Sequence, residues 1–453
     1  MEYKEFLKRK EFNPISSGFD PCLGRYALKD FQHDIVRWAC NRGRAAIFAD
    51  TGLGKTFMQL AWAEQVCINT SRPVLILAPL AVSDQTIEEG QKFGIRIEKY
   101  NGDINLLPGI YITNYEQLKN VDPSQFSGVV LDESSILKGL DGRLRKLITD
   151  SFKHTPYKLS CTATPSPNDL MEFGTQSEFL GVMSLVEMLA MFFIHDGENT
   201  SKWRLKGHGR RKFWEWLSTW SVFIRKPSDY GYESEGYDLP PLEIHEHVIE
   251  SGITDGLLPW IAQSLSERNE ARRKTVDVRV SKASEIANSV DGQCLIWCHL
   301  NDESQKLSQS IDGSFEVYGS QKPDEKTRLL LGFSHGEVSR LVTKPKIAGF
   351  GMNWQACNHM VFTGLSDSFE QYYQAVRRCW RFGQTKTVHV HIVSSDSEGA
   401  VVANIKRKEQ QHEETAKEMI KAVGEFTAKQ LGKSFQQKTE YKPTQKMRIP
   451  SWM

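Results

Sequence analysis

The stretch RAAIFADTGLGKT, residues 44–56, decides the fold class of this chain. Its apolar first half predicts a buried β-strand, and the glycine-rich half leads into a segment with helical spacing. A strand, a glycine loop and a helix start in this order place backbone N–H groups and the positive helix end around a phosphate group. Gly52 and Gly54 permit close approach of that group, Lys55 is suited to reach β- and γ-phosphates, and Thr56 is suited to ligate Mg²⁺.

Apolar runs of the same kind recur in two series along the chain. They alternate with longer polar or helical segments, which is typical of a parallel sheet covered by helices. The first series is RAAIFAD, PVLILAP, IYIT, GVVLDE and YKLSCTAT, and the second is QCLIWCH, FEVYG, RLVTK, HMVFTG and VHVHIV. We therefore predict an α/β protein with two parallel sheets, whose ligand sites lie at the carboxyl ends of the strands.

The length and composition of the chain fit two domains. Its 453 residues exceed what one ordinary core encloses, and 40% hydrophobic with 25% charged residues is typical of a folded protein. DLPPL, residues 238–242, predicts an extended linker because each proline disfavours helix in the residue before it. We expect a first domain over 1–240 with a helical insertion at about 170–235, a second over 241–404, and a helical or loosely ordered basic tail over 405–453.

Three segments outside the strand series have open roles. Large apolar residues in the insertion recur at helical spacing, which favours a buried helical face over a base-stacking platform. They are Phe213, Trp216, Leu217, Trp220, Phe223 and Ile224. A basic cluster before them is either a phosphate-contacting loop or a solvated loop, and consists of Lys202, Arg204, Lys206, Arg210, Arg211 and Lys212. The lysine-rich tail is either loosely ordered or a nucleic-acid contact.

The run VVLDESS, residues 129–135, ends in two adjacent carboxylates. Mg²⁺ keeps several waters and is held by one or two carboxylates together with phosphates, a role that suits Asp132 at a strand end. Glu133 is then placed to orient or deprotonate an attacking water. An apolar run before Asp-Glu is weak evidence alone, but it gains weight behind a phosphate loop.

Transfer of a phosphoryl group builds charge on its oxygens, and a competent site usually adds an arginine from another element. QAVRRCWRFGQ, residues 374–384, supplies the candidates. Arg378 and Arg381 are three positions apart, so they share one face if the segment is helical. We expect both to point toward the γ-phosphate, although an arginine-rich helix alone is usually a solvated face.

These motifs, in this order, resemble those of superfamily 2 helicases, most closely the Swi/Snf-type DNA translocases. The resemblance runs from about Leu28 to Val393 and implies two RecA-like domains in tandem with one ATP and Mg²⁺ site between them. In the first domain, LKDFQ resembles the adenine-reading segment, LILAPLAV resembles the first strand-contacting segment, ITNYEQL resembles a tyrosine-containing element, and CTATPSPND resembles the Thr-Pro loop. In the second domain, CLIWCHLNDE resembles the opening strand, and KIAGFGMNWQ resembles the glycine and asparagine loop. The implied nucleotide contacts are Gln32, Thr51, Gly52, Leu53, Gly54, Lys55, Thr56, Gly351 and Gln384, the metal ligands Thr56 and Asp132, and the catalytic residues Glu133, Arg378 and Arg381.

The chain departs from the family pattern at two motifs. Ala49 stands where the standard phosphate loop has its first glycine. Ser134 and Ser135 stand where relatives usually carry Ala-His or Ala-Asp, so we expect the link between the acidic box and the Thr-Pro loop to differ. Chromatin-reading modules are not obvious in the sequence, which favours a minimal motor resembling stand-alone phage or bacterial members.

The resemblance implies an ATP-dependent translocase that moves along DNA, with duplex as the expected track and single strand as the alternative. Two other functions stay open: a strand-separating DNA or RNA helicase, and a nucleotide-gated adaptor without turnover. The net charge of +1 requires any nucleic-acid surface to be local. Scattered cysteines and a charged start, MEYKEFLKRK, predict a cytoplasmic protein, in the host cytoplasm if it is phage-encoded, with no membrane span.

Overall fold

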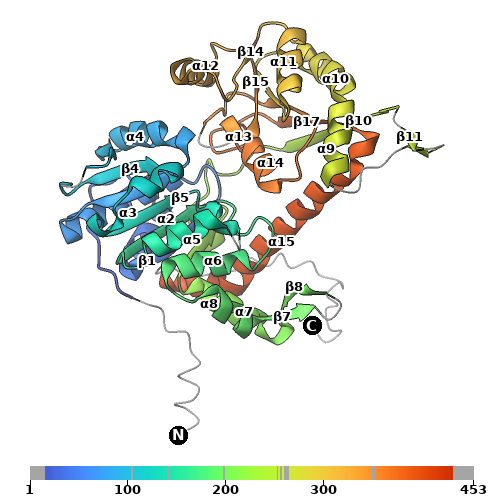
Figure 1. The fold of residues 1–453 in the computed structure, drawn as a ribbon. Helices are drawn as coiled ribbons and strands as arrows, with labels where there is room; N and C mark the ends of the chain where they lie inside the picture. Colours follow the sequence, from blue (N-terminus) through green and yellow to red (C-terminus); the bar gives the residue numbers. More distant parts are fainter. Residues whose placement is uncertain are drawn as a thin grey trace, which may run out of the picture.

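The computed structural model describes residues 16–103, 106–139, 142–196, 199–252, 254–255, 258–259, 265–348 and 352–431. Two lobes follow one another along the chain, each built on a parallel sheet with helices on its faces (Figure 1). This arrangement confirms the predicted α/β class with two RecA-like parallel sheets in tandem.

The first sheet has the strand order β3-β4-β2-β5-β6-β1-β9, and all its pairs are parallel. Its strands are β1 (Arg44–Ala49), β2 (Val74–Ala78), β3 (Ile97–Lys99), β4 (Ile110–Asn114), β5 (Gly128–Asp132), β6 (Tyr157–Thr162) and β9 (Ser221–Ile224). The helices of this lobe are α2 (Asp30–Arg42), α3 (Lys55–Thr70), α4 (Ser83–Lys92), α5 (Arg143–Ser151), α6 (Glu172–Leu180), α7 (Leu185–Phe192) and α8 (Arg210–Ser218). The apolar runs predict β1, β2, β4, β5 and β6, but not β3 or β9.

Both faces of the first sheet are buried, which explains why its strands read as continuous apolar runs. On one face Ala45 and Ile47 of β1 pack in a core with α2 and α3. On the other face Ala46 and Phe48 pack in a core with α5, α6 and α8. The alternation along β1 therefore separates two cores, while the carboxyl end of the strand leads into the glycine loop.

The insertion that follows β6 departs from its predicted helical face. Phe213 and Trp216 are buried in α8 as predicted. Phe223 and Ile224 instead lie in β9, which pairs with β1 at the edge of the first sheet. The helical prediction is wrong for these two residues because SVFI is rich in β-branched and aromatic side chains that favour a strand.

Only part of the basic cluster is a loop, because Lys206 lies in the connection from β8 (Asn199–Leu205) to α8 while the other members lie in those two elements; contact with phosphate stays a prediction. Lys202 and Arg204 lie in β8, which pairs with β7 (Phe193–Asp196) in an antiparallel hairpin. Arg211 lies in the first turn of α8, which begins at Arg210, and it pairs with Glu215 one turn later.

The second sheet has the order β10-β17-β16-β13-β15-β14 and is also parallel throughout. Its strands are β10 (Leu242–Ile249), β13 (Cys294–Trp297), β14 (Ser314–Glu316), β15 (Arg340–Thr343), β16 (His359–Thr363) and β17 (Val388–Ser395). Its helices are α9 (Leu265–Lys274), α10 (Val276–Ser289), α11 (Asn301–Ser310), α12 (Pro323–His335), α13 (Pro345–Ala348) and α14 (Phe369–Val376). A short pair, β11 (Thr254–Asp255) and β12 (Leu258–Pro259), lies between β10 and α9. The second series of apolar runs predicts every strand of this sheet except β10.

A long helix, α15 (Gly399–Gln430), runs from the second lobe to the first (Figure 1). Val401 near its start is buried in the core of the second lobe, and Met419 is buried in a core of the first. Glu418 also pairs with Arg210 of α8, the Nε contact being 3.2 Å. The part of the predicted tail up to residue 430 is therefore a helix that contacts both lobes, and the tail after residue 431 lies outside the described residues.

No helix in the described part of the chain is long and apolar enough to cross a bilayer.

A buried ion network ties the second lobe together. Arg279 of α10 is fully buried, and its guanidinium lies 2.6 Å from Glu303 of α11 and 3.3 Å from Glu398, which follows β17. The same side chain donates a hydrogen bond to the Thr363 carbonyl at 2.9 Å. Because these charges have left water, each depends on its partners for compensation.

Replacing Arg279 with methionine removes the guanidinium that contacts both Glu303 and Glu398. We expect a loss of about 3–5 kcal/mol in the free energy of unfolding, since Glu303 is left buried without its guanidinium, whereas Glu398 keeps Arg272 at 3.5 Å. Urea denaturation followed by circular dichroism measures the change in the second lobe's transition.

The matched control is Arg211→Met, whose side chain is 85% exposed. We expect a change below about 1 kcal/mol for this variant. Equal effects of the two substitutions would contradict the role given to the Arg279 network.

Candidate active site

One residue from each lobe packs closely against the glycine loop between β1 and α3. Gly52 and Gly54 have positive φ angles of 89° and 77°, which favour glycine. A Cβ at Gly52 would lie 2.9 Å from the Cβ of Phe382 in the second lobe, and one at Gly54 would collide with the Gln32 amide. Both glycines are therefore needed for close packing around the loop, in addition to any approach of a phosphate.

Side chains from three strand ends of the first lobe and from the second lobe line one pocket. The strand ends of β1, β2 and β5 meet here because parallel strands place their carboxyl ends at the same edge. The lining residues are Thr51, Gly52, Gly54, Lys55, Thr56, Pro79, Val82, Gln85, Thr86, Glu89, Asp132, Glu133, Gln374, Arg378 and Arg381. The structure thus brings together the predicted lysine, both carboxylates and both arginines.

Lys55 and Asp132 are perturbed by their burial. The Lys55 ammonium donates a hydrogen bond to the Ala49 carbonyl at 2.8 Å. Burial lowers the pKa of this lysine, although Glu133 and Asp50 nearby oppose the shift. Burial, followed by the adjacent Glu133 carboxylate, raises the pKa of Asp132 to about 6. Such shifts are common where charged groups await a charged ligand.

Glu133 is held in an uncommon backbone conformation. Its φ of 62° lies in the left-handed region, which is rare for a non-glycine residue and is often found at functional sites. Its carboxylate accepts hydrogen bonds from Ser135 at 3.0 Å and from the Thr162 hydroxyl of the Thr-Pro loop. Burial raises the pKa of Glu133, which brings it closer to that of a useful general base. The acidic box is therefore joined to the Thr-Pro loop through Glu133 itself, while the Ser134 carbonyl accepts a bond from Gln176 at 2.8 Å.

Arg378 and Arg381 lie beyond the helix on which the sequence placed them. α14 ends at Val376, and the two arginines belong to the turn that follows. Both donate to the Met352 carbonyl, at 3.0 and 3.2 Å, so their common side is fixed by this shared acceptor instead of by helical spacing. Within the described residues, the buried Nε of Arg381 has no hydrogen-bond acceptor, which leaves a donor for an anion at the pocket.

The two lobes also meet through a contact that the sequence did not predict. Arg377 of the second lobe lies 2.7 Å from the Asp50 carboxylate of the glycine loop, and Tyr373 donates a 2.6 Å hydrogen bond to the same carboxylate. Burial alone would raise the pKa of Asp50, but Arg377 and Tyr373 outweigh it and leave the value below its usual range. Gln374 adds a 3.5 Å contact to Glu133. In the sequence, Tyr373, Gln374 and Arg377 lie next to the predicted arginines, and this proximity is the signal that could have indicated their contact with the first lobe.

The remaining predicted nucleotide contacts are arranged differently. Gln32 lies against the loop, where its amide donates to the Leu53 carbonyl at 2.9 Å and accepts from the Lys29 amide at 3.0 Å. The amide group of Gln384 is used within the second lobe, where it donates to the Cys357 carbonyl and accepts from the Thr385 amide, and Gln384 does not line the pocket. Gly351 lies outside the described residues.

The pocket fits a nucleotide with Mg²⁺ on two observations. Lys55, Arg378 and the free Arg381 Nε offer positive donors that match a triphosphate. Asp132 and Thr56 line the same pocket and offer the hard oxygen donors that Mg²⁺ prefers. These residues would hold the ion, and the arginines would meet the phosphates from the opposite lobe.

Replacing Arg377 with methionine should loosen the contact between the lobes. The substitution leaves Asp50 without its buried partner, which typically costs about 3–5 kcal/mol. We therefore expect a larger radius of gyration in the nucleotide-free protein, measured by small-angle X-ray scattering. Arg407→Met, an exposed arginine of α15 that bonds to Asn404 and Gln411, is the control. An unchanged radius in both variants would show that the ion pair does not hold the lobes together.

Known proteins match this chain along most of its length. Residues 279–383 match the family model "Helicase conserved C-terminal domain", a segment that includes Arg378 and Arg381. The mouse (Mus musculus) "DNA annealing helicase and endonuclease ZRANB3" is 22% identical over 450 residues, covering 86% of this chain and 41% of that protein. The zebrafish (Danio rerio) "Chromodomain-helicase-DNA-binding protein 1-like" is 23% identical over 447 residues, covering 81% and 42%. The chain spans about two fifths of the length of these relatives.

This chain is also similar to part of a third curated protein and to one solved structure. The fission yeast (Schizosaccharomyces pombe) "SWI/SNF chromatin-remodeling complex subunit snf22" is 26% identical over 176 residues, covering 34% of this chain and 10% of that protein. The "Sulfolobus solfataricus SWI2/SNF2 ATPase core in complex with dsDNA" aligns at 18% identity and a TM-score of 0.43, covering 83% of this chain and 90% of that one. The family model over residues 279–383 and these curated relatives, together with the ordered motifs, show that this chain is similar to Swi/Snf-type superfamily 2 helicases.

Proposed function

We propose that this protein is an ATP-dependent DNA translocase that hydrolyses ATP in the pocket between its two lobes. The observation that carries the proposal is the shared pocket, in which Lys55 and Glu133 from the first lobe face Arg378 and Arg381 from the second. Because the site is divided between the lobes, hydrolysis depends on the position of one lobe relative to the other. Motion of the lobes and turnover are thereby coupled.

Each group in the pocket has a separate task in the proposed reaction. Lys55 and the loop amides bind the β- and γ-phosphates, and Mg²⁺ held by Thr56 and Asp132 would neutralise charge on them. Glu133, fixed by the Thr162 hydrogen bond, orients the attacking water and accepts its proton. Arg378 and Arg381 stabilise the charge that develops on the transferred group.

The Thr-Pro loop provides a route from ATP to the track. Thr162 bonds the Glu133 carboxylate and also accepts a hydrogen bond from the Thr164 amide at 3.0 Å, so the carboxylate and the loop share one hydroxyl. A change at the γ-phosphate that moves Glu133 would therefore also shift the Thr-Pro loop. The names of the curated relatives tie those proteins to DNA, which supports DNA as the track here.

Duplex DNA is the track we favour, with single-stranded DNA as the alternative. The Swi/Snf resemblance supports the duplex, and contacts to phosphates would give little sequence preference and strong salt dependence. A strand-separating helicase would use the same pocket, and an adaptor would bind nucleotide without turnover. The cytoplasmic location also remains a prediction from the sequence.

The steady-state ATPase rate with no nucleic acid, single-stranded DNA, blunt duplex DNA and RNA tests the proposal. We expect the largest stimulation with blunt duplex. A preference for single strands or RNA would favour a helicase, and DNA binding without turnover would favour the adaptor. Glu133→Gln is the blank, because it keeps the hydrogen bonds but removes the base.

Lys55→Ala should abolish turnover and leave the fold intact, because the variant loses its phosphate contact. Lys153→Ala is the control, since Lys153 is exposed after α5 in the same lobe. The ATPase rate checks the loss of turnover, and circular dichroism checks that the fold is intact. Near-normal turnover in Lys55→Ala would refute the assignment of the phosphate loop.

Arg381→Ala should lower the ATPase rate by on the order of 10³ or more while sparing ATP binding. The reason is that Arg381 reaches the pocket from the second lobe and is expected to act on charge that develops during transfer. Arg407→Ala, on the exposed face of α15, should keep the normal rate. Loss of ATP binding with Arg381→Ala would instead give this arginine a role in holding the ground state.

A further inference from the structure

A row of histidines crosses the edge of the second sheet, outside the nucleotide pocket. His245 and His247 lie on β10, His389 and His391 on the neighbouring β17, and His359 on β16. The rings of these residues stack, with centroids 4.7 Å apart for His245 and His391 and 4.8 Å for His359 and His389. The proposed ATPase uses none of these side chains.

The strand pattern explains why they share a face. In LEIHEHVI and VHVHIV the histidines occupy alternate positions, and alternate positions point to the same side of a sheet. The parallel register sets Glu243 beside His389 and His245 beside His391. The intervening Val388 and Val390 are buried on the opposite face. A sheet with this register therefore collects imidazoles and one carboxylate at its edge.

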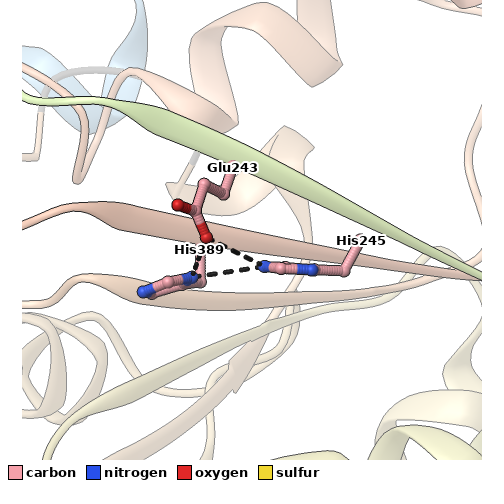
Figure 2. A group of neighbouring side chains, drawn as sticks. All are labelled: Glu243, His245 and His389. Carbon is pink, nitrogen blue, oxygen red and sulfur yellow. Dashed lines mark hydrogen bonds and ion pairs between the residues drawn. The ribbon is translucent and has the colours of Figure 1, made fainter.

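Three of these side chains converge on one point, as Figure 2 shows. Glu243 Oε2 lies 3.2 Å from His389 Nδ1 and 3.7 Å from His245 Nε2, and the two nitrogens are 3.2 Å apart. Tetrahedral Zn²⁺ with bonds of about 2.0–2.2 Å has ligand atoms roughly 3.3–3.5 Å from one another. The three atoms therefore already form one face of such a tetrahedron.

The donor set selects the kind of ion. Two imidazole nitrogens and one carboxylate oxygen suit Zn²⁺ and similar transition metals, whereas Mg²⁺ and Ca²⁺ prefer oxygen ligands alone. The side chains of Glu243, His245 and His389 are 53%, 39% and 28% exposed, so an ion can enter and keep a water ligand. His247 Nε2 and His391 Nδ1 are also close, at 3.1 Å, but these two form a pair without a carboxylate.

The position of β10 offers a second explanation for the polar residues. It is the edge strand of its sheet, and charged side chains on an edge strand discourage pairing with other chains. Glu246 and Glu250, on and after the strand, are exposed charged side chains of this kind. Edge protection does not require three donor atoms to converge from two strands.

We propose that Glu243, His245 and His389 bind one divalent transition-metal ion of the Zn²⁺ class, with water completing the coordination. The ion joins β10 to β17 at the first residues of β10. Because β10 directly follows the segment that leads out of the first lobe, the metal fixes the edge strand at the point where the second lobe begins.

Titration of the full, chelator-treated chain with Zn²⁺ in excess Mg²⁺ tests this site. Isothermal calorimetry should show one tight equivalent, and Co²⁺ should give the visible absorption of a tetrahedral nitrogen and oxygen site. His245→Ala and His389→Ala should each weaken Zn²⁺ binding by more than the roughly 10- to 100-fold that follows loss of an outer-shell partner. Zn²⁺ should also raise the thermal unfolding midpoint of the wild type but not of the Glu243→Gln, His245→Ala, His389→Ala triple variant.

The paired control is His247→Ala with His391→Ala, which removes two histidines of the same row and should retain the tight equivalent. Circular dichroism without metal shows whether each variant is folded. The proposal is overturned if the wild type binds no Zn²⁺ tightly, if the folded triple variant binds it with unchanged affinity, or if the paired control alone loses it.

Discussion

The buried ion pair between Asp50 and Arg377 is the contact on which the candidate site depends. Asp50 is the first residue of the glycine loop, and Arg377 directly precedes the first of the two pocket arginines. Their 2.7 Å contact therefore sets the distance between the loop and Arg378. A buried pair of this kind is weak evidence for stability but is well suited to fix one arrangement of two bodies. Tyr373 strengthens this restraint by bonding the same carboxylate.

Two further elements constrain how the lobes move around that pair. Lys138 after the acidic box pairs with Glu370 of α14, which makes a second bridge on the Glu133 side of the pocket. α15 packs with both lobes, and its Lys408 donates to Asn168 of the Thr-Pro loop at 3.3 Å and to the Asp367 carbonyl at 3.4 Å. Lobe motion in the proposed translocation cycle therefore has to rearrange contacts at the pocket and along α15. This helix therefore connects the two lobes and is not a separate tail.

The sequence predicts what depends on local patterns and misses what depends on long-range pairing. β1 and β5 are predictable because burial on both faces makes them continuous apolar runs. β10 was missed because an edge strand with histidines and glutamates at its positions has no such run. Lys55, Asp132 and Glu133 belong to short motifs, and their roles stay predictions that the pocket geometry supports. Arg377 could not be paired with Asp50 from sequence, since 327 positions separate them.

In the proposed mechanism both lobes hold the same ATP molecule at once. The structure of Glu133→Gln with ATP and Mg²⁺ bound tests it most directly, because this variant should retain nucleotide without hydrolysing it. We expect the β- and γ-phosphates to contact Lys55 on one side and Arg378 and Arg381 on the other. ATP bound to the first lobe alone, with both arginines still bonded to the Met352 carbonyl and away from the phosphates, would contradict it.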